Sequence, residues 1–247
     1  MGVSLAIFLH IVELGSRIAP PKASVMLGRQ SFRHKPRHAK SIRRALAKYE
    51  KYQGMTVEGL VDDSGYTERM FRALGFGEVE TMDFSAYEGA QILHDLNKPL
   101  PKTLKGRFDF VFDGGTTEHV FDVAQCFRNM FDMLAVGGTL ISVTPFNGWP
   151  GHGFFQFQPD LVWSFWRHMA GCEVVKCIAL PYDASEAPID LPDNKGNKRR
   201  REYDNALPPG RVFLYYEVRK LAGSKLTGVA LQADYETKWQ ESAEEDA

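Results

Sequence analysis

Two histidines and one glutamate stand where a side chain could act on a substrate. His119 belongs to the triplet Glu118-His119-Val120, which follows an apolar run and a polar turn. His152 lies between two glycines in a loop rich in aromatic residues, where packing gives little reason for a histidine. An imidazole titrates near neutral pH and can take a proton from a hydroxyl nucleophile. We therefore predict His119 and His152 as candidate catalytic bases.

Each of these side chains also has an ordinary structural explanation. A histidine at the start of a helix, such as His119, often only packs or hydrogen-bonds. Glu118 can contact the substrate, orient either histidine or interact with a helix N-terminus. Phe154, with the neighbouring phenylalanines 155 and 157, can wall a substrate pocket or pack in the core. Glu118 and Phe154 are thus candidate substrate residues, and both explanations stay open.

Acidic residues end three successive apolar runs. They are Asp83, Asp95 and Asp113. Because the carboxyl ends of parallel strands meet at one edge of a sheet, these carboxylates are expected at a common edge. A carboxylate there can accept both hydrogen bonds of a ribose diol. Gly28 follows a shorter apolar run, and a glycine at a strand end lets a ligand approach the backbone.

The segment from Phe108 to Pro145 predicts the unit that positions these groups. Phe108–Phe112 is a buried strand, and a helix capped by Thr116 or Thr117 follows the turn after it. Gly137-Gly138 ends the predicted helix, and a second strand runs from Thr139 to Thr144. A strand, helix and strand in this order predict parallel neighbours joined by a right-handed crossover.

Elsewhere the chain alternates strands and helices. An amphipathic first helix precedes Ala19; further strands are predicted at 23–27, 79–84, 91–96, 172–180 and 211–219, and helices at 66–74 and 160–170. Residues 181–210 are predicted as a loop containing the basic run Lys198 to Arg201. Five strands that largely alternate with helices, followed by a closing strand pair, predict a three-layer α/β domain.

This order, with its strand-end acids, resembles the class I S-adenosylmethionine-dependent methyltransferases over roughly residues 20–220. The Glu118-His119-Val120 triplet is similar to that of a small-molecule branch of the family, and MDFSAYEGAQILHDLN is similar to bacterial methyltransferases. The resemblance implies a Rossmann-like methyltransferase fold with a mostly parallel, seven-stranded sheet whose last strand is antiparallel. It also implies S-adenosyl-L-methionine as cofactor.

The resemblance assigns cofactor roles to residues at the ends of the strands. Leu27, Gly28 and Arg29 stand in the first loop, Asp83 at the ribose hydroxyls, Asp95 and Leu96 at the adenine, and Asp113 and Gly114 at the mouth shared with the substrate. The family usually has several glycines in the first loop, whereas this chain has only Gly28. A basic insertion at about residues 31–64 separates Gly28 from Asp83 by 55 positions.

The whole-chain properties bound the classes of function. The 247 residues are interpreted as one domain over 1–222 and a partly frayed extension over 223–247. A net charge of −1 argues against a protein that binds nucleic acid over its whole surface. No apolar run reaches the roughly 18 residues needed to cross a membrane. The three cysteines indicate a reduced, cytoplasmic protein, and Cys172 and Cys177 lack the partners of a zinc site, so no metal is predicted.

Two functions remain open at this point. The first is a methyltransferase acting on a small molecule, at oxygen, with a sugar or secondary metabolite as acceptor. The second is an inactive methyltransferase-like module that binds a partner or polyanion through residues 29–51, which hold nine Lys or Arg and one acid. A nicotinamide-dependent oxidoreductase is disfavoured because no G-x-G-x-x-G motif follows the first strand.

Overall fold

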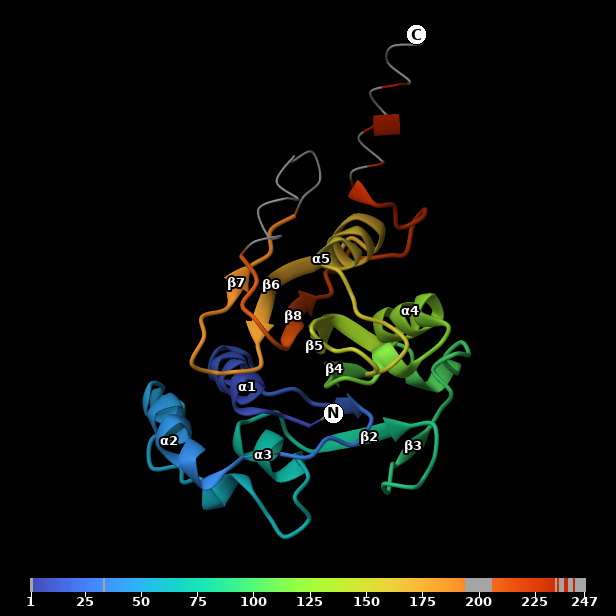
Figure 1. Cartoon of the computed structure of the whole chain (residues 1–247). Helices are drawn as coiled ribbons and strands as arrows, with labels where there is room; N and C mark the ends of the chain where they lie inside the picture. The colour runs from blue at the N-terminus through green and yellow to red at the C-terminus, as the bar shows by residue number, and fades with distance from the viewer. Residues whose placement is uncertain are drawn as a thin grey trace.

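The computed structural model describes residues 2–32, 34–193 and 206–233, and single residues 235, 238, 239 and 242. Eight strands form one sheet: β1 (Ser24–Leu27), β2 (Val79–Asp83), β3 (Ile92–Leu93), β4 (Phe108–Asp113), β5 (Leu134–Asn147), β6 (Glu173–Pro181), β7 (Ile189–Asp190) and β8 (Val212–Arg219). Their spatial order is β3-β2-β1-β4-β5-β8-β6-β7 (Figure 1).

Strands β3, β2, β1, β4 and β5 are mutually parallel, and β8 runs antiparallel to both of its neighbours, β5 and β6. The predicted Rossmann-like sheet, mostly parallel with an antiparallel last strand, is confirmed. The one addition is β7, a two-residue edge strand inside the segment predicted as a loop.

The register brings the predicted strand ends to one edge. Leu27 of β1 pairs with Met82 of β2 on one side and with Asp113 of β4 on the other. Asp83 therefore lies one residue past this level, next to Gly28, whose N–H donates to Met82 at 2.8 Å. The polar residues that the sequence places after β1, β2 and β4 thus share the carboxyl edge of the sheet.

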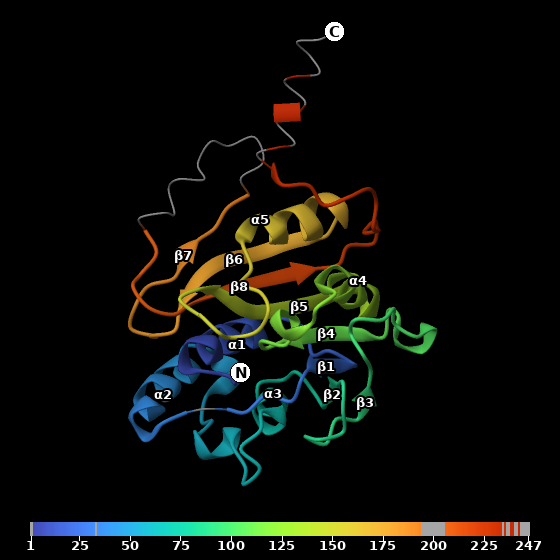
Figure 2. The same cartoon turned by 45° about the vertical axis from the view of Figure 1, so that its right-hand side comes forward.

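Helices cover both faces of the sheet (Figure 2). On one side lie α1 (Leu5–Arg17), α2 (Ala39–Ala47) and α3 (Glu68–Ala73); on the other lie α4 (Val123–Met133) and α5 (Pro159–Val162), which continues as a π-helix over Trp163–Met169. Successive strand residues serve opposite layers. Met26 and Phe110 pack under α1 to α3, whereas Val25 and Val111 pack under α4 and the π-helix.

The helix of the central unit differs from the prediction at both ends. It begins at Val123 with Asp122 as N-cap, whose carboxylate accepts from Gln125 N–H at 3.0 Å, and Thr117–His119 forms a separate 3-10 turn. The helix ends at Met133, and the glycine pair 137–138 lies inside β5. The predicted capping threonines are instead engaged with Asp113, which removes them from the helix start.

Two stretches predicted from the sequence fall partly or wholly outside the described residues. The basic run Lys198 to Arg201 lies outside them, as does most of the tail beyond residue 233. Within the extension, Lys225 N–H donates to Ala170 and Thr227 N–H to Met169, at 3.0 and 3.1 Å, so its first residues pack on the end of the π-helix. None of the helices in the described parts is both long and apolar enough to cross a membrane.

Candidate functional site

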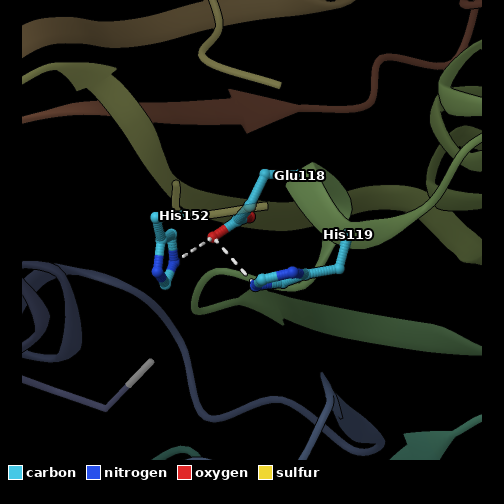
Figure 3. Close-up of side chains that lie close together, drawn as sticks. All are labelled: Glu118, His119 and His152. Carbon is cyan, nitrogen blue, oxygen red and sulfur yellow. Dashed lines mark hydrogen bonds and ion pairs between the residues drawn. The ribbon is translucent and has the colours of Figure 1, made fainter. Parts of the chain in front are cut away.

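Glu118, His119 and His152 come together at the carboxyl edge of the sheet (Figure 3). The first two stand in the 3-10 turn after β4, and His152 stands in the loop after β5. Glu118 Oε1 lies 3.3 Å from His152 Nε2 and 3.8 Å from His119 Nε2. The two imidazole rings meet edge to face, with centroids 5.1 Å apart. The fold thus joins two segments that the sequence separates by about 30 positions.

The backbone of Glu118 also holds the loop that carries His152. Its carbonyl oxygen accepts from Phe154 N–H at 2.7 Å and from Phe155 N–H at 3.3 Å. Gly153 has φ +72°, and a Cβ at this position would lie 2.8 Å from the Glu118 carbonyl oxygen. Glycine at 153 is therefore required both by its backbone conformation and by this close approach.

Burial decides the protonation of the cluster. Glu118 is fully buried, and desolvation, followed by the nearby charge of Asp113, raises its pKa to about 8. Its Oε2 has no hydrogen-bond partner among the described residues. Burial also lowers the pKa of His119 and of His152, whose side chains are 48% and 29% exposed. At neutral pH the histidines are therefore uncharged and able to accept a proton.

Asp113 joins this cluster to the sheet beneath it. One of its carboxylate oxygens accepts from the N–H groups of Thr116 and Thr117, at 2.9 and 3.3 Å. The other accepts from the hydroxyls of Thr117 and Ser142, both at 2.7 Å. The carboxylate is fully buried. Its oxygens are thus occupied by the protein, and its observed contacts hold the turn after β4; the cofactor role implied by the resemblance stays a prediction. Gly114 is equally constrained, since a Cβ there would lie 2.7 Å from the ring of Phe112.

The first loop is tied to the turn after β4. Gly28 has φ +64°, and a Cβ on it would lie 2.6 Å from Thr116 Oγ1, which itself donates to the Leu27 carbonyl at 2.6 Å. The side chain of Leu27 is in the core. The lone glycine thus lets two loops meet at the sheet edge.

Arg29 points away from Gly28 into a set of contacts of its own. It pairs with Glu68 at 2.6 Å and donates to the Glu88 carbonyl at 2.8 Å, and its guanidinium lies 3.9 Å from the centre of the Tyr66 ring. These contacts fasten the first loop to the chain beyond the insertion. They give Arg29 a structural explanation besides the cofactor role implied by the resemblance.

Asp83 fits a ligand with a diol. Its Oδ1 accepts from Phe84 N–H at 2.6 Å, and its Oδ2 makes no hydrogen bond within the described residues. Phe84, the next residue in the chain, is 75% exposed. An available carboxylate oxygen next to an exposed aromatic face suits a nucleoside, because the acid accepts from hydroxyls while the ring stacks on a base.

Asp95 and Leu96 lie farther along the same edge. Asp95 accepts from the backbone and side-chain nitrogens of Asn97 at 3.0 and 2.8 Å, and these bonds lower its pKa. Leu96 is buried in the core, and its carbonyl accepts from Asn129. In the structure Asp95 is therefore half-buried, whereas the side chain of Leu96 lies in the core.

An aromatic pair borders the histidine cluster. Phe154, 66% exposed, meets the exposed ring of Phe121 edge to face, with centroids 5.9 Å apart. Phe121 was missed in the sequence because it lies between two residues of the helical apolar pattern and was not itself part of that pattern. Because α4 begins only at Val123, Phe121 lies outside the packed face of the helix.

No protein-family model matches this chain, and no curated protein matches its sequence. Among solved structures it is similar to the 1,6-didemethyltoxoflavin-N1-methyltransferase of Burkholderia thailandensis with bound S-adenosylhomocysteine (14% identity, TM-score 0.43, 88% of this chain and 76% of that one). It is also similar to an O-methyltransferase of a Brevibacillus brevis polyketide synthase (10% identity, TM-score 0.44, 95% of this chain and 76% of that one).

A third similar structure is the [4+2]-cyclase SpnF (10% identity, TM-score 0.41, 87% of this chain and 82% of that one). These identities and TM-scores determine neither the reaction of this chain nor its acceptor. The reaction has to be inferred from the side chains at the carboxyl edge.

Proposed function

We propose that this protein is an S-adenosylmethionine-dependent methyltransferase that methylates a hydroxyl of a small molecule. The observation that carries the proposal is the meeting, at one sheet edge, of two different half-sites. One consists of Gly28, Asp83 and the exposed ring of Phe84, and it suits a nucleoside. The other is the cluster of Glu118 with two neutral histidines, and it suits proton removal.

The cofactor would occupy the first half-site. Asp83 Oδ2 would accept from its ribose hydroxyls and Phe84 would stack on its adenine, with Asp95 beyond. The backbone at Gly28 would pass beneath its methionine part. When bound, S-adenosylmethionine supplies a methyl group that is carried on a sulfonium, and the sulfur is the leaving group when the methyl group is transferred in line to the acceptor. The protein mainly has to orient the two reactants.

The acceptor would occupy the second half-site. In the protein without bound ions, a ring nitrogen of His152 or of His119 that Glu118 does not contact takes the proton of the acceptor hydroxyl. Glu118 is a positioning residue, since its carboxyl contacts His152 and its carbonyl holds the loop that carries His152. The exposed rings of Phe121 and Phe154 would lie against an apolar part of the acceptor.

Calorimetry with S-adenosylhomocysteine tests the cofactor half of the proposal. We expect binding that weakens about 10- to 100-fold in Asp83→Asn, because a charged acceptor of two hydrogen bonds is lost. The control is Asp63→Asn, which changes an exposed acid in the insertion. Absence of heat and of a thermal shift at millimolar S-adenosylhomocysteine in a folded protein would contradict the proposal.

A second candidate function is supported by the surface of α2. Ile42 and Leu46 of this helix pack in the core, while Arg43 and Arg44 point to solvent. The apolar face of this helix holds it on the protein, and its basic face is exposed. Such an exposed basic face is suited to binding a polyanion. Salt-dependent binding of RNA or heparin that Arg43→Gln with Arg44→Gln abolishes would support it. Unchanged binding in that double variant would rule this helix out.

A further inference from the structure

The cluster of Glu118, His119 and His152 has the composition of a metal site. Each residue offers one ligand atom, and the three atoms lie within 4.8 Å of one another. Two imidazole nitrogens and one carboxylate oxygen form a donor set that first-row transition metals accept, with coordination positions left open for water or substrate. The sequence did not predict it, because the spacing of these residues matches no familiar ligand motif.

The distances are close to those of a coordinated ion. Ligand atoms held at about 2.0–2.2 Å from one metal lie roughly 3.0–3.5 Å apart. Glu118 Oε1 already lies 3.3 Å from His152 Nε2 and 3.8 Å from His119 Nε2. The distance to His119 is the longer of the two, so the half-exposed His119 side chain would have to turn toward the other two (Figure 3).

A second observation points to a missing partner. Glu118 is fully buried, and its Oε2 has no hydrogen-bond partner among the described residues. A buried carboxyl oxygen without a hydrogen-bond partner is costly unless something compensates it. A metal ion would provide that compensation and would require the ionised carboxylate.

The site is also held in place by its surroundings. The Glu118 carbonyl fastens the loop after β5 through two N–H groups, and Gly153 allows the approach. The ring of His152 lies against Trp149, with centroids 5.3 Å apart, and the indole N–H of Trp149 donates to Val212 at 2.9 Å. Two of the three ligands are therefore positioned before any ion binds, which reduces the ordering cost of binding.

We propose that Glu118, His119 and His152 bind a divalent first-row transition-metal ion, whose open coordination positions face the acceptor hydroxyl. The binding itself is independent of methyl transfer; only this use of the ion rests on the proposed function. The ion and the base role compete, because a neutral histidine that coordinates the ion through Nε2 carries its proton on Nδ1 and has no nitrogen left to accept another. In the metal-loaded protein the ion would lower the pKa of the bound hydroxyl, whose proton would pass to water.

The test is calorimetry and thermal shift with Zn²⁺, and then Mn²⁺, on full-length, tag-free protein first treated with EDTA. We expect about one equivalent of Zn²⁺ and a raised melting temperature, with affinity reduced at least about tenfold in Glu118→Gln and in His152→Ala. The matched control is His168→Ala, which removes a histidine of another histidine–carboxylate pair, His168 Nε2 with Asp193 Oδ2 at 2.8 Å. This variant should bind Zn²⁺ as the parent protein does.

Two outcomes would overturn the proposal. One is the absence of a Zn²⁺- or Mn²⁺-induced shift; the other is binding that survives in both site variants or is lost in His168→Ala. If Glu118→Gln does not fold, His119→Ala takes its place, because this half-exposed side chain can be removed without opening the core. S-adenosylhomocysteine binding in the same preparations reports separately on the proposed function, so each hypothesis can fail without the other.

Discussion

Glu118 connects the two segments of the candidate site through both its backbone and its side chain. Its carbonyl accepts from the loop after β5, and its carboxyl lies between His119 and His152. A substitution that moves this loop should therefore change the geometry of the histidines, even if it touches neither ring. The glycines around His152 allow this to be examined directly.

We predict that Gly153→Ala weakens both Zn²⁺ binding and any methyl transfer, and destabilises the protein by about 1–3 kcal/mol. The reason is a Cβ 2.8 Å from the Glu118 carbonyl oxygen, on a backbone with φ +72°. Gly151→Ala is the matched control, because Gly151 has the same φ and nothing within 4 Å of a Cβ. Melting curves and Zn²⁺ titrations of both variants measure the difference. Equal losses in the two would show that backbone conformation alone matters.

Asp113 has a structural role that the resemblance did not reveal. Both of its oxygens are occupied by Thr116, Thr117 and Ser142. We predict that Asp113→Ala lowers the free energy of unfolding by about 3 kcal/mol, because buried hydroxyl and N–H donors lose their acceptor. Asp109→Ala, in the half-buried start of the same strand, should cost about 1 kcal/mol. Denaturant unfolding compares them, and a smaller loss for Asp113→Ala would contradict this role.

For single residues, the sequence was sufficient to select the candidate side chains but not to predict how deeply each of them is buried. His119, His152 and Glu118 were chosen because of their chemistry and their place after strands, and the structure brings them together. Nothing in a local pattern indicates that Glu118 is fully buried, since burial comes from a loop more than 30 positions away. The same limit explains Leu96, whose side chain lies in the core although its position suggested a ligand contact.

Among the elements, α4 illustrates how distant residues determine a boundary. Its last turn is closed by Lys220, which follows β8 and donates to the carbonyls of Phe131 and Leu134 at 2.7 and 2.8 Å. A buried ammonium group thus satisfies carbonyl groups that a helix end leaves unpaired. The sequence pointed to Gly137-Gly138 as the end of the helix, because a local reading has no access to this contact.

We predict that Lys220→Met destabilises the protein by about 2 kcal/mol, since it keeps the apolar stem but removes two charge-assisted hydrogen bonds. Lys225→Met is the control, because Lys225 is exposed and lies just beyond. Thermal unfolding of both variants is the measurement. A shift of equal size in the two would indicate that the carbonyl groups near the end of α4 find water instead.

Across the whole molecule, the layers and the mostly parallel sheet were predictable and the strand lengths were not. Alternating strand and helix patterns with a closing pair lead to one three-layer topology, because crossovers are right-handed and connections short. β3 and β7 have only two residues each, and their lengths depend on pairing with β2 and β6 at the sheet edges. The π-helix after α5 is likewise invisible to a 3.6-residue pattern.

The amino-terminal helix is fastened to the antiparallel half of the sheet by charged residues. Glu13 of α1 pairs with Lys176 of β6 at 2.8 Å, and Arg17 pairs with the buried Glu217 of β8. The hydroxyl of Tyr215 donates to Glu217 at 2.7 Å. These contacts lie near a cavity of about 460 Å³ at the amino edge of the sheet, on the opposite side from the histidine cluster. They stabilise the layer that α1 contributes.

This network makes stability depend on pH through Glu13. Its interaction with the His10 ring, and then its pair with Lys176, lower its pKa from 4.5 to about 2. A carboxyl whose folded pKa is depressed stabilises the protein above its unfolded pKa, and that contribution is lost as pH falls from about 4.5 to about 2. Because the side chain is 39% exposed, we expect about 1 kcal/mol or less.

The measurement is the difference in unfolding free energy between the parent protein and Glu13→Gln, followed from pH 7 to pH 3. The difference should be constant above about pH 5 and shrink below it, because the parent alone loses the charge on Glu13. Glu186→Gln changes an exposed glutamate away from α1 and should show no such convergence. A difference that grows on acidification would mean that Glu13 opposes the docking of α1 on the sheet.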